Sequence, residues 1–295
     1  MQVAQSQEPP SHSTIPLPTS RNLTVPVPGF IARTNSFPAT LVVSPDGRYA
    51  ALLNQGFGTE DSGVRQSIGI LDLIDNRLSD FPDDRLADHK KQSYFIGLAF
   101  STDGAHLYAS MASVSDSGIA VYSFLEGRVR PERYIPIAAA TLARGKTLAY
   151  QAEKTASGKA PSYPAGLAVV PSPNGDRLLV ADNLADRVLL MDAASGQILR
   201  RIDLSRSRYV PTAYPYTVIA NRSGTRAWVS LWNDSAVAEL DLLKGKVVRR
   251  IVLWRPAHAF APGTHPTALV LSRSEHVLYV ALANAGNAAI DGVAA

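Results

Sequence analysis

The stretch that decides the fold is residues 163–203, YPAGLAVVPSPNGDRLLVADNLADRVLLMDAASGQILRRID. Four short runs rich in Val, Leu and Ile alternate in it with polar segments, among them the turn sequences Pro173-Asn174-Gly175 and Ser195-Gly196. Gly and Asn tolerate the positive φ angles of tight turns between antiparallel strands. The stretch therefore predicts a meander of four short β-strands.

The same order of strands and turns recurs along the chain. Pro164, Pro215 and Pro266 occupy the same position in three units and lie 51 residues apart. Looser units open at Phe37-Pro38 and Phe95-Ile96. A fixed period is typical of repeat folds, and a four-stranded sheet cannot bury both apolar faces alone. Sheets stacked around an axis solve that problem, whereas a β-sandwich needs no such period, so we predict an all-β fold, a β-propeller of four-stranded antiparallel blades.

The repeat also predicts how the chain is divided. We expect residues 1–22 to form a disordered lead rich in Pro and Ser, and residues 23–295 to form the propeller. About four and a half blades of a seven-bladed ring can be counted, because the unit opening at His265 reaches only residues 288–291 and lacks its outer strand. We therefore expect a propeller truncated at the C-terminus, an open arc with apolar faces exposed at both ends, and Leu23–Val27 as a strand awaiting a partner. Insertions at 55–66 and 140–162 are expected to be surface loops.

Composition excludes several classes of protein. Hydrophobic residues make up 46% and charged residues 18% of the chain, which indicates a globular core. Cysteine is absent, so disulfides and thiolate chemistry are excluded. The net charge of +4 is spread over loops, which gives no indication of a nucleic-acid partner, and no apolar run is long enough to cross a bilayer.

Several motifs resemble those of the YVTN-repeat propellers, over about residues 30–291. These are the turn Ser44-Pro45-Asp46-Gly47, the strand end Leu278-Tyr279-Val280-Ala281 with Asn284, and Leu190-Met191-Asp192. The chain further resembles the propeller of bacterial proteins in which such repeats precede a phosphoesterase domain of the alkaline-phosphatase superfamily. The resemblance implies the fold but no activity, and the phosphoesterase segment does not occur within these 295 residues.

Three possible chemical motifs favour structural explanations. Ala140–Thr147 fits a permissive phosphate-binding loop, but it lies in a polar insertion without the strand and helix that such a loop needs. The histidines, including His258 and His265, lack the spacing of a zinc pair, so we expect no metal and no cofactor. Acidic residues that recur once per unit are expected to accept backbone N–H groups in turns: Asp46, Asp72, Asp103, Asp192 and Asp241.

Strand direction predicts a candidate binding site. In an antiparallel meander, the segment that leads into the first strand and the exit of the second strand lie on the same face of the ring. Aromatic and amide side chains gather at these positions and could line a central mouth that takes a small molecule or peptide. In the alternative explanation the aromatics wedge between blades and the amides turn the chain. The candidates are Phe37, Asn54, Tyr163, Asn183, Tyr214, Trp232, Asn233, Asp234, His265 and Asn284.

The sequence thus favours a non-enzymatic ligand- or protein-binding propeller with no catalytic residue of its own. We expect it in the periplasm or secreted, because the small, polar and Pro-containing start resembles a mature exported terminus, although it carries no signal peptide. The alternative is a lactonase-type hydrolase, since lactonases related to 6-phosphogluconolactonase use a similar propeller. An intracellular interaction hub of the WD-repeat kind is less favoured, because the Gly-His and Trp-Asp signature is missing.

Overall fold

The structure, a computed structural model, describes residues 13–16, 22–25, 30–35, 37–56, 65–83, 93–113, 116–149, 159–253, 263–283 and 292–294. Four sheets of four antiparallel strands follow one another within these residues, and each is a simple meander. The fold class predicted from the repeat is therefore confirmed: the chain forms blades arranged as a β-propeller. No helix in the described residues is long and apolar enough to cross a membrane.

Each blade runs from an inner to an outer strand. The first blade comprises β3 (Pro38–Val43), β4 (Tyr49–Asn54), β5 (Ser67–Asp72) and β6 (Arg77–Pro82). The second comprises β7 (Ser93–Phe100), β8 (His106–Ala112), β9 (Gly118–Leu125) and β10 (Arg128–Pro136). The third comprises β14 (Pro164–Val170), β15 (Arg177–Asp182), β16 (Arg187–Asp192) and β17 (Ile198–Asp203). The fourth comprises β19 (Pro215–Ala220), β20 (Arg226–Leu231), β21 (Ala236–Asp241) and β22 (Lys246–Val252).

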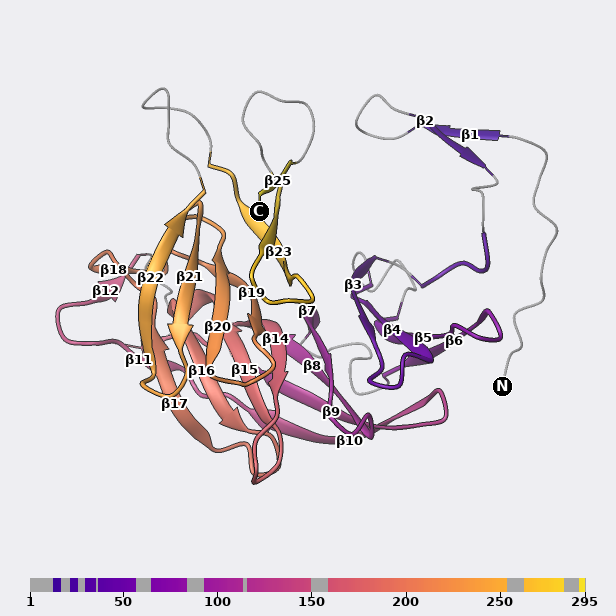
Figure 1. Cartoon of the computed structure of the whole chain (residues 1–295), viewed down its shortest axis with the longest axis horizontal. Helices are drawn as coiled ribbons and strands as arrows, with labels where there is room; N and C mark the ends of the chain where they lie inside the picture. Colours follow the sequence, from indigo (N-terminus) through magenta and orange to yellow (C-terminus); the bar gives the residue numbers. More distant parts are fainter. Residues whose placement is uncertain are drawn as a thin grey trace.

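A fifth sheet has three strands, β23 (Pro266–Leu271), β24 (Leu278–Leu282) and β25 (Gly292–Ala294). Pro164, Pro215 and Pro266 each begin an inner strand, as predicted. The sheets follow a curved path, with β7, β14 and β19 on its inner side and β10, β17 and β22 on its outer side (Figure 1). Apolar side chains are exposed on the sheets at both ends of this path, Leu41 and Val43 on β3 and Val270 and Tyr279 on the fifth sheet.

The blades are held together by apolar layers between neighbouring sheets. Successive residues of β15 show the pattern, because Leu178 packs in the layer toward the second blade and Leu179 in the layer toward the fourth. Both faces of a central blade are buried, which is why its strands are apolar throughout and do not alternate with polar residues. Each fully buried Leu contributes about 1.5–3 kcal/mol of hydrophobic stabilisation.

Glycines allow the inner strands to approach closely. A Cβ at Gly166 would lie 2.7 Å from the Cα of Thr217 in the next blade, and a Cβ at Gly97 would meet the carbonyl of Ala165. The absence of a side chain at these positions therefore lets β7, β14 and β19 pack backbone to backbone.

The turns behave as the sequence predicts. Gly47, Gly104, Gly175 and Gly224 all have positive φ angles. The acidic turn residues accept backbone N–H groups, for example Asp192 from Ser195 at 2.7 Å and Asp241 from Lys244 at 2.8 Å. These bonds favour the charged carboxylates and lower the pKa of both residues; for Asp192 the largest contribution is the Ser195 hydroxyl.

The insertion at 140–162 was expected to be only a surface loop, and that expectation is wrong for its described parts. Its strands β11 (Ala140–Thr141) and β13 (Lys159–Ala160) pair, while β12 (Thr147–Leu148) pairs in parallel with β18 (Tyr209–Val210). Ala140, Ala160 and Val210 are buried together against the third blade, which is the physical reason that these described parts of the insertion form paired strands. Lys146, from the apparent phosphate-binding motif, donates to the carbonyls of Ser205 and Ser207.

The N-terminal segment also differs in part from expectation. Within the expected lead, β1 (Ser13–Pro16) pairs antiparallel with β2 (Asn22–Val25). The strand expected at Leu23–Val27 therefore has a local partner and is not paired with the fifth sheet, whose third described strand is β25. Local pairing needs only a short loop, which costs less chain entropy than pairing across the molecule. The boundary at residues 22 and 23 remains a prediction.

Candidate functional site

The two faces of the propeller have the composition that strand direction predicts. On one face, called here the mouth face, Asn183 N–H donates to Tyr163 O at 2.9 Å and Trp232 N–H donates to Tyr214 O at 3.1 Å. In both of these blades the segment leading into the inner strand is thus bonded to the exit of the second strand. Gly175 and Gly224 lie in the turns at the other ends of these strands, and Gly196 and Gly245 lie on the same side in the turns after the third strands; we call this side the turn face. The prediction that strand entries and second-strand exits share one face is confirmed for these residues.

A backbone irregularity shared by the inner strands shapes the mouth. In each of them the register with the second strand shifts just after the first paired residues, a bulge that lies at Pro38/Thr40, Tyr94/Leu98, Pro164/Leu167, Pro215/Val218 and Pro266/Leu269. Bulges change the direction in which neighbouring side chains point and are common beside binding sites. They distinguish the start of each inner strand from the regular ladder that follows it.

Three aromatic rings from three different blades meet near these bulges. The Phe95 ring packs edge to face against Tyr163, with 5.3 Å between centroids, and against Tyr216, with 6.0 Å. We call Phe95, Tyr163 and Tyr216 the mouth aromatics. All three are half-buried, and among the described residues the Tyr163 and Tyr216 hydroxyls have no hydrogen-bond partner. Burial raises the pKa of both phenols, so they stay protonated and can donate.

Only Tyr163 of this cluster was predicted from the sequence. Phe95 was assigned to the start of an inner strand, and Tyr216 follows Pro215 within the strand. A strict strand alternation would not identify them as mouth residues, since the bulge changes the alternation at these positions. The recurrence of an aromatic residue within three positions of the strand start was the available signal.

A second aromatic pair joins the fourth and fifth sheets. The rings of Trp232 and His265 stack with centroids 4.0 Å apart and planes 24° apart. His265 Nδ1 lies 3.1 Å from the Trp232 carbonyl, which can only accept, so Nδ1 carries the proton. Trp232 retains 37% of its surface exposed. The structure thus brings these two predicted residues together.

Three of the predicted aromatics have strained backbones. Phe37, Tyr214 and His265 have φ angles of 55°, 51° and 47° although each precedes a proline. Bulky residues rarely adopt this left-handed region, and a following proline disfavours helical conformations further. Such strain costs on the order of 1–3 kcal/mol per residue and persists only where surrounding contacts impose it.

The predicted amides have structural roles in the described contacts. Asn183 Nδ2 donates to Pro215 O in the next blade, and Asn233 Nδ2 donates to Thr212 O. Asn54 is fully buried and donates to Ser67 and Asp80, while its Oδ1 has no partner. These contacts agree with the alternative explanation that the amides turn and tie the chain. Asn284 lies outside the described residues.

Asp234 pairs with Arg250, whose Nη1 lies 3.1 Å from Oδ2. Burial raises the pKa of Asp234, and Arg250 and Arg206 oppose that shift. The described residues hold no group of three or more His, Asp or Glu side chains that could bind a metal ion. His12, His89 and His258 lie outside them.

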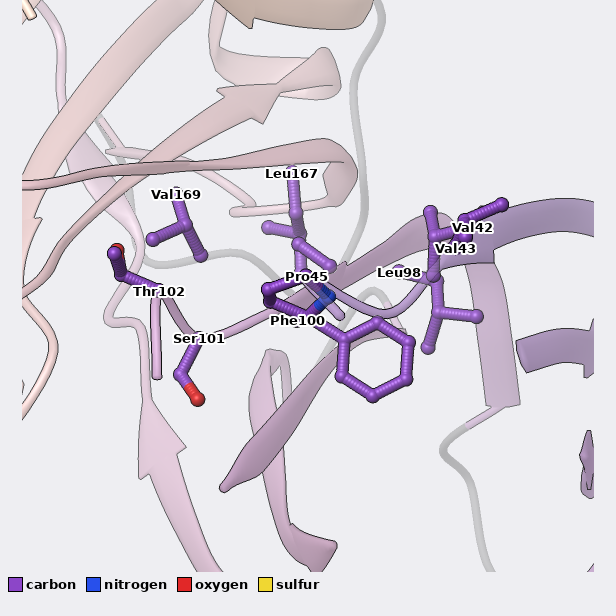
Figure 2. Close-up of a pocket in the computed structure, with 10 residues that line it drawn as sticks. Val42, Val43, Pro45, Leu98, Phe100, Ser101, Thr102, Leu167 and Val169 are labelled. Carbon is purple, nitrogen blue, oxygen red and sulfur yellow. The ribbon is translucent and has the colours of Figure 1, made fainter. Parts of the chain in front are cut away.

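A separate hollow lies toward the turn face, between β3, β7 and β14 (Figure 2). Its volume is about 530 Å³ and its walls are mainly apolar, including Val42, Leu98 and Leu167. The two hydroxyls in its wall are already used, because Ser101 donates to Asp103 at 2.6 Å and Thr102 donates to Asp176 at 2.5 Å. The hollow therefore offers apolar contact and few free polar groups, unlike the mouth face.

Comparison with known proteins identifies the architecture. No family model and no curated protein matches the chain. A periplasmic gluconolactonase from Pseudomonas aeruginosa superposes with a TM-score of 0.56 at 21% identity, over 85% of this chain and 66% of that one. A putative 6-phosphogluconolactonase from Bacteroides uniformis gives 0.55 at 15%, over 93% and 70%. Hydrazine synthase from Kuenenia stuttgartiensis gives 0.54 at 16%, over 87% and 58%.

The chain spans 58% and 66% of the lengths of the hydrazine synthase and the gluconolactonase. Identities of 15–21% show a shared fold and no more. The chain is similar to lactonase propellers and to propellers of other function, and it is a β-propeller.

Proposed function

We propose that this propeller is a binding module without catalytic activity, whose ligand is held at the mouth aromatics. The observation that carries the proposal is the contact of Phe95 with both Tyr163 and Tyr216 across three blades. It forms an apolar wall with two free phenol hydroxyls, a combination of apolar surface and few polar groups that is typical of ligand pockets. The ligand class that fits is an uncharged ring with an apolar face and hydroxyl or carbonyl groups, such as a sugar.

The hydrogen bonds and ion pairs around the mouth aromatics favour binding over catalysis. Catalysis by acid and base needs paired groups within hydrogen-bond reach of the reacting atoms. Among the described residues, the hydrogen bonds and ion pairs join no such side-chain pair at the mouth aromatics. The carboxylate of Asp182 bonds the Tyr163 amide and is buried with Arg187.

The proposal includes a place in the cell envelope, as the polar, exported-type start of the sequence suggests, and association with a phosphoesterase of the alkaline-phosphatase superfamily. The YVTN-type motifs support the second part, and the fold shared with a periplasmic gluconolactonase is compatible with the first. Fractionation of cells that express the native gene, followed by detection of the chain in the periplasm, the medium or the cytoplasm, would test the location.

The binding proposal is tested by titrating methyl pyranosides and glucono-1,5-lactone while following tyrosine and tryptophan fluorescence. Tyr163→Phe and Tyr216→Phe remove only a hydroxyl, so each should weaken binding about 2- to 13-fold, the loss of one hydrogen bond of about 0.5–1.5 kcal/mol. Tyr279→Phe on β24 is the matched control, because Tyr279 is exposed and belongs to the fifth sheet. Equal affinities of all three variants would contradict the proposed site.

Lactone hydrolysis is the second candidate, since half-buried phenols can also donate to the carbonyl of a cyclic ester. A titrimetric assay with glucono-1,5-lactone and its 6-phosphate distinguishes the two. Turnover above the spontaneous rate that Tyr163→Phe or Tyr216→Phe lowers would replace the binding proposal by the enzymatic one.

A further inference from the structure

One position recurs in three blades and connects each of them to the mouth of the next. It is the residue immediately before the third strand, Gln66 before β5, Asp186 before β16 and Ser235 before β21. The side-chain oxygens of Asp186 and Ser235 accept backbone N–H groups of the segment that leads into the next inner strand, and that of Gln66 accepts the N–H of Tyr94, the second residue of β7. We call these three residues the latch residues.

Asp186 makes the most extensive of these contacts. Its side chain is fully buried, and its carboxylate accepts N–H groups of Thr212 at 2.7 Å, Ala213 at 3.1 Å and Tyr214 at 3.0 Å. Asp186 itself has a left-handed φ of 45°. Three convergent N–H groups fix the backbone of the segment on which the strained Tyr214 lies.

Ser235 repeats the arrangement one blade later. It also has a left-handed φ, 49°, and its Oγ accepts the Thr264 N–H at 3.0 Å, directly before the strained His265. Gln66 Oε1 accepts the Tyr94 N–H at 2.6 Å, directly before Phe95. At each latch, at least one bonded amide thus belongs to a mouth-face aromatic residue or to its immediate neighbour.

Among the described residues the second blade has no latch bond, and a different contact takes its place. At the same position in the second blade, Ser117 bonds Ser113 in its own blade, and the next inner strand follows the long insertion. There Asp182 accepts the Tyr163 N–H at 2.7 Å instead. Four aromatic residues lie directly before an inner strand: Phe37, Tyr163, Tyr214 and His265. Among these four, Tyr163 is the residue without a left-handed φ. The strained conformations of Tyr214 and His265 coincide with the presence of a latch bond from the preceding blade.

We propose that the latch residues are positioning residues for the mouth face: in the first, third and fourth blades, one side chain sets the conformation of the segment that carries the next sheet's aromatic residue. The proposed placement of the aromatic residues does not depend on the proposed function; its consequence for ligand affinity rests on that function. Asp186 accepts three N–H groups, whereas Gln66 and Ser235 each accept one, so the effect should be largest at Asp186.

The test uses the whole chain without ligand. Tyrosines are labelled with 3-fluorotyrosine and the Tyr214 signal is assigned with Tyr214→Phe. Asp186→Ala should move that 19F signal and accelerate amide exchange at residues 212–214 at least about tenfold, because several N–H bonds are lost. Asp186→Asn, which keeps an acceptor oxygen, should restore most of both readouts.

Asp192→Ala is the matched control, because Asp192 lies at the opposite end of β16 and bonds its own turn. It should leave the exchange rates at residues 212–214 within about twofold of those of the original protein and the 19F signal in place. A general loss of stability would instead accelerate exchange in this variant too. If Asp186→Ala does not fold, Ser235→Ala gives the same comparison at residues 264–265. Unchanged exchange and an unmoved signal in the folded variant would overturn the proposal. Absence of any ligand would refute only the binding function.

Discussion

The buried ion pair between Asp182 and Arg187 gives the sharpest prediction about stability. Asp182 is fully buried and Arg187 is 8% exposed, and Nε lies 2.7 Å from Oδ2. The other carboxylate oxygen accepts the Ser162 hydroxyl at 3.1 Å and the Tyr163 N–H at 2.7 Å. Removing one charge leaves the other desolvated and unpaired, which costs about 3–5 kcal/mol.

Arg187→Met is the informative change, because it keeps much of the side-chain volume and removes the positive charge that pairs with the buried Asp182 carboxyl. With an unfolding entropy of about 2.1 cal/mol/K per residue, that cost lowers the Tm by roughly 5–8 °C for a chain of this length. Asp182→Asn should lower it similarly, and the double variant should lose less than the two single changes together. The coupling energy from this double-mutant cycle should exceed about 1 kcal/mol.

The measurement is thermal and urea unfolding of the four proteins, followed by circular dichroism at constant pH and salt. Arg48→Met is the control, because Arg48 pairs with Asp72 at 3.0 Å but is itself 45% exposed, and water screens such a pair to about 0–1 kcal/mol. Losses at Arg187 no larger than those at Arg48, or fully additive single changes, would show that the pair is not desolvated as the structure indicates.

Three further predictions follow from the packing. Gly97→Ala should destabilise by about 1–3 kcal/mol or more because its Cβ meets the Ala165 carbonyl, whereas Gly69→Ala, with its nearest neighbour at 3.4 Å, should cost less in the same urea series. Tyr122→Phe should cost about 1–3 kcal/mol, because its buried hydroxyl donates to Asp83 at 2.5 Å and bonds Tyr94; an unchanged urea midpoint would contradict this. Burial raises the pKa of Asp186, and the nearby Asp234 adds to that shift. The protonated Asp186 carboxyl therefore contributes stability that is fully present below the pKa of Asp186 in the unfolded chain. This stability is lost as the pH rises through the pKa of Asp186 in the folded protein. The unfolding free energy of the original protein minus that of Asp186→Asn should therefore decrease from about pH 4 to pH 7, and an increase would refute the assignment.

The fold was predictable because its determinants are local and repeated. Turn glycines, the proline that begins each inner strand and strand runs apolar on both faces are all visible in residues 163–203, and their recurrence requires stacked sheets. The face on which Tyr163 and Asn183 lie followed from strand direction alone. No contact between distant residues had to be known.

The make-up of the mouth was decided by tertiary structure. Phe95 and Tyr216 come together from the second and fourth blades, and nothing local in the sequence marks their bulges. Those bulges accompany the close approach of neighbouring strands at Gly97 and Gly166. Asn183 likewise has its partner, Pro215, in the next blade. Side-chain direction at a bulge and the choice of hydrogen-bond partner depend on which backbones pack together, so a pattern with a period of two residues cannot specify them.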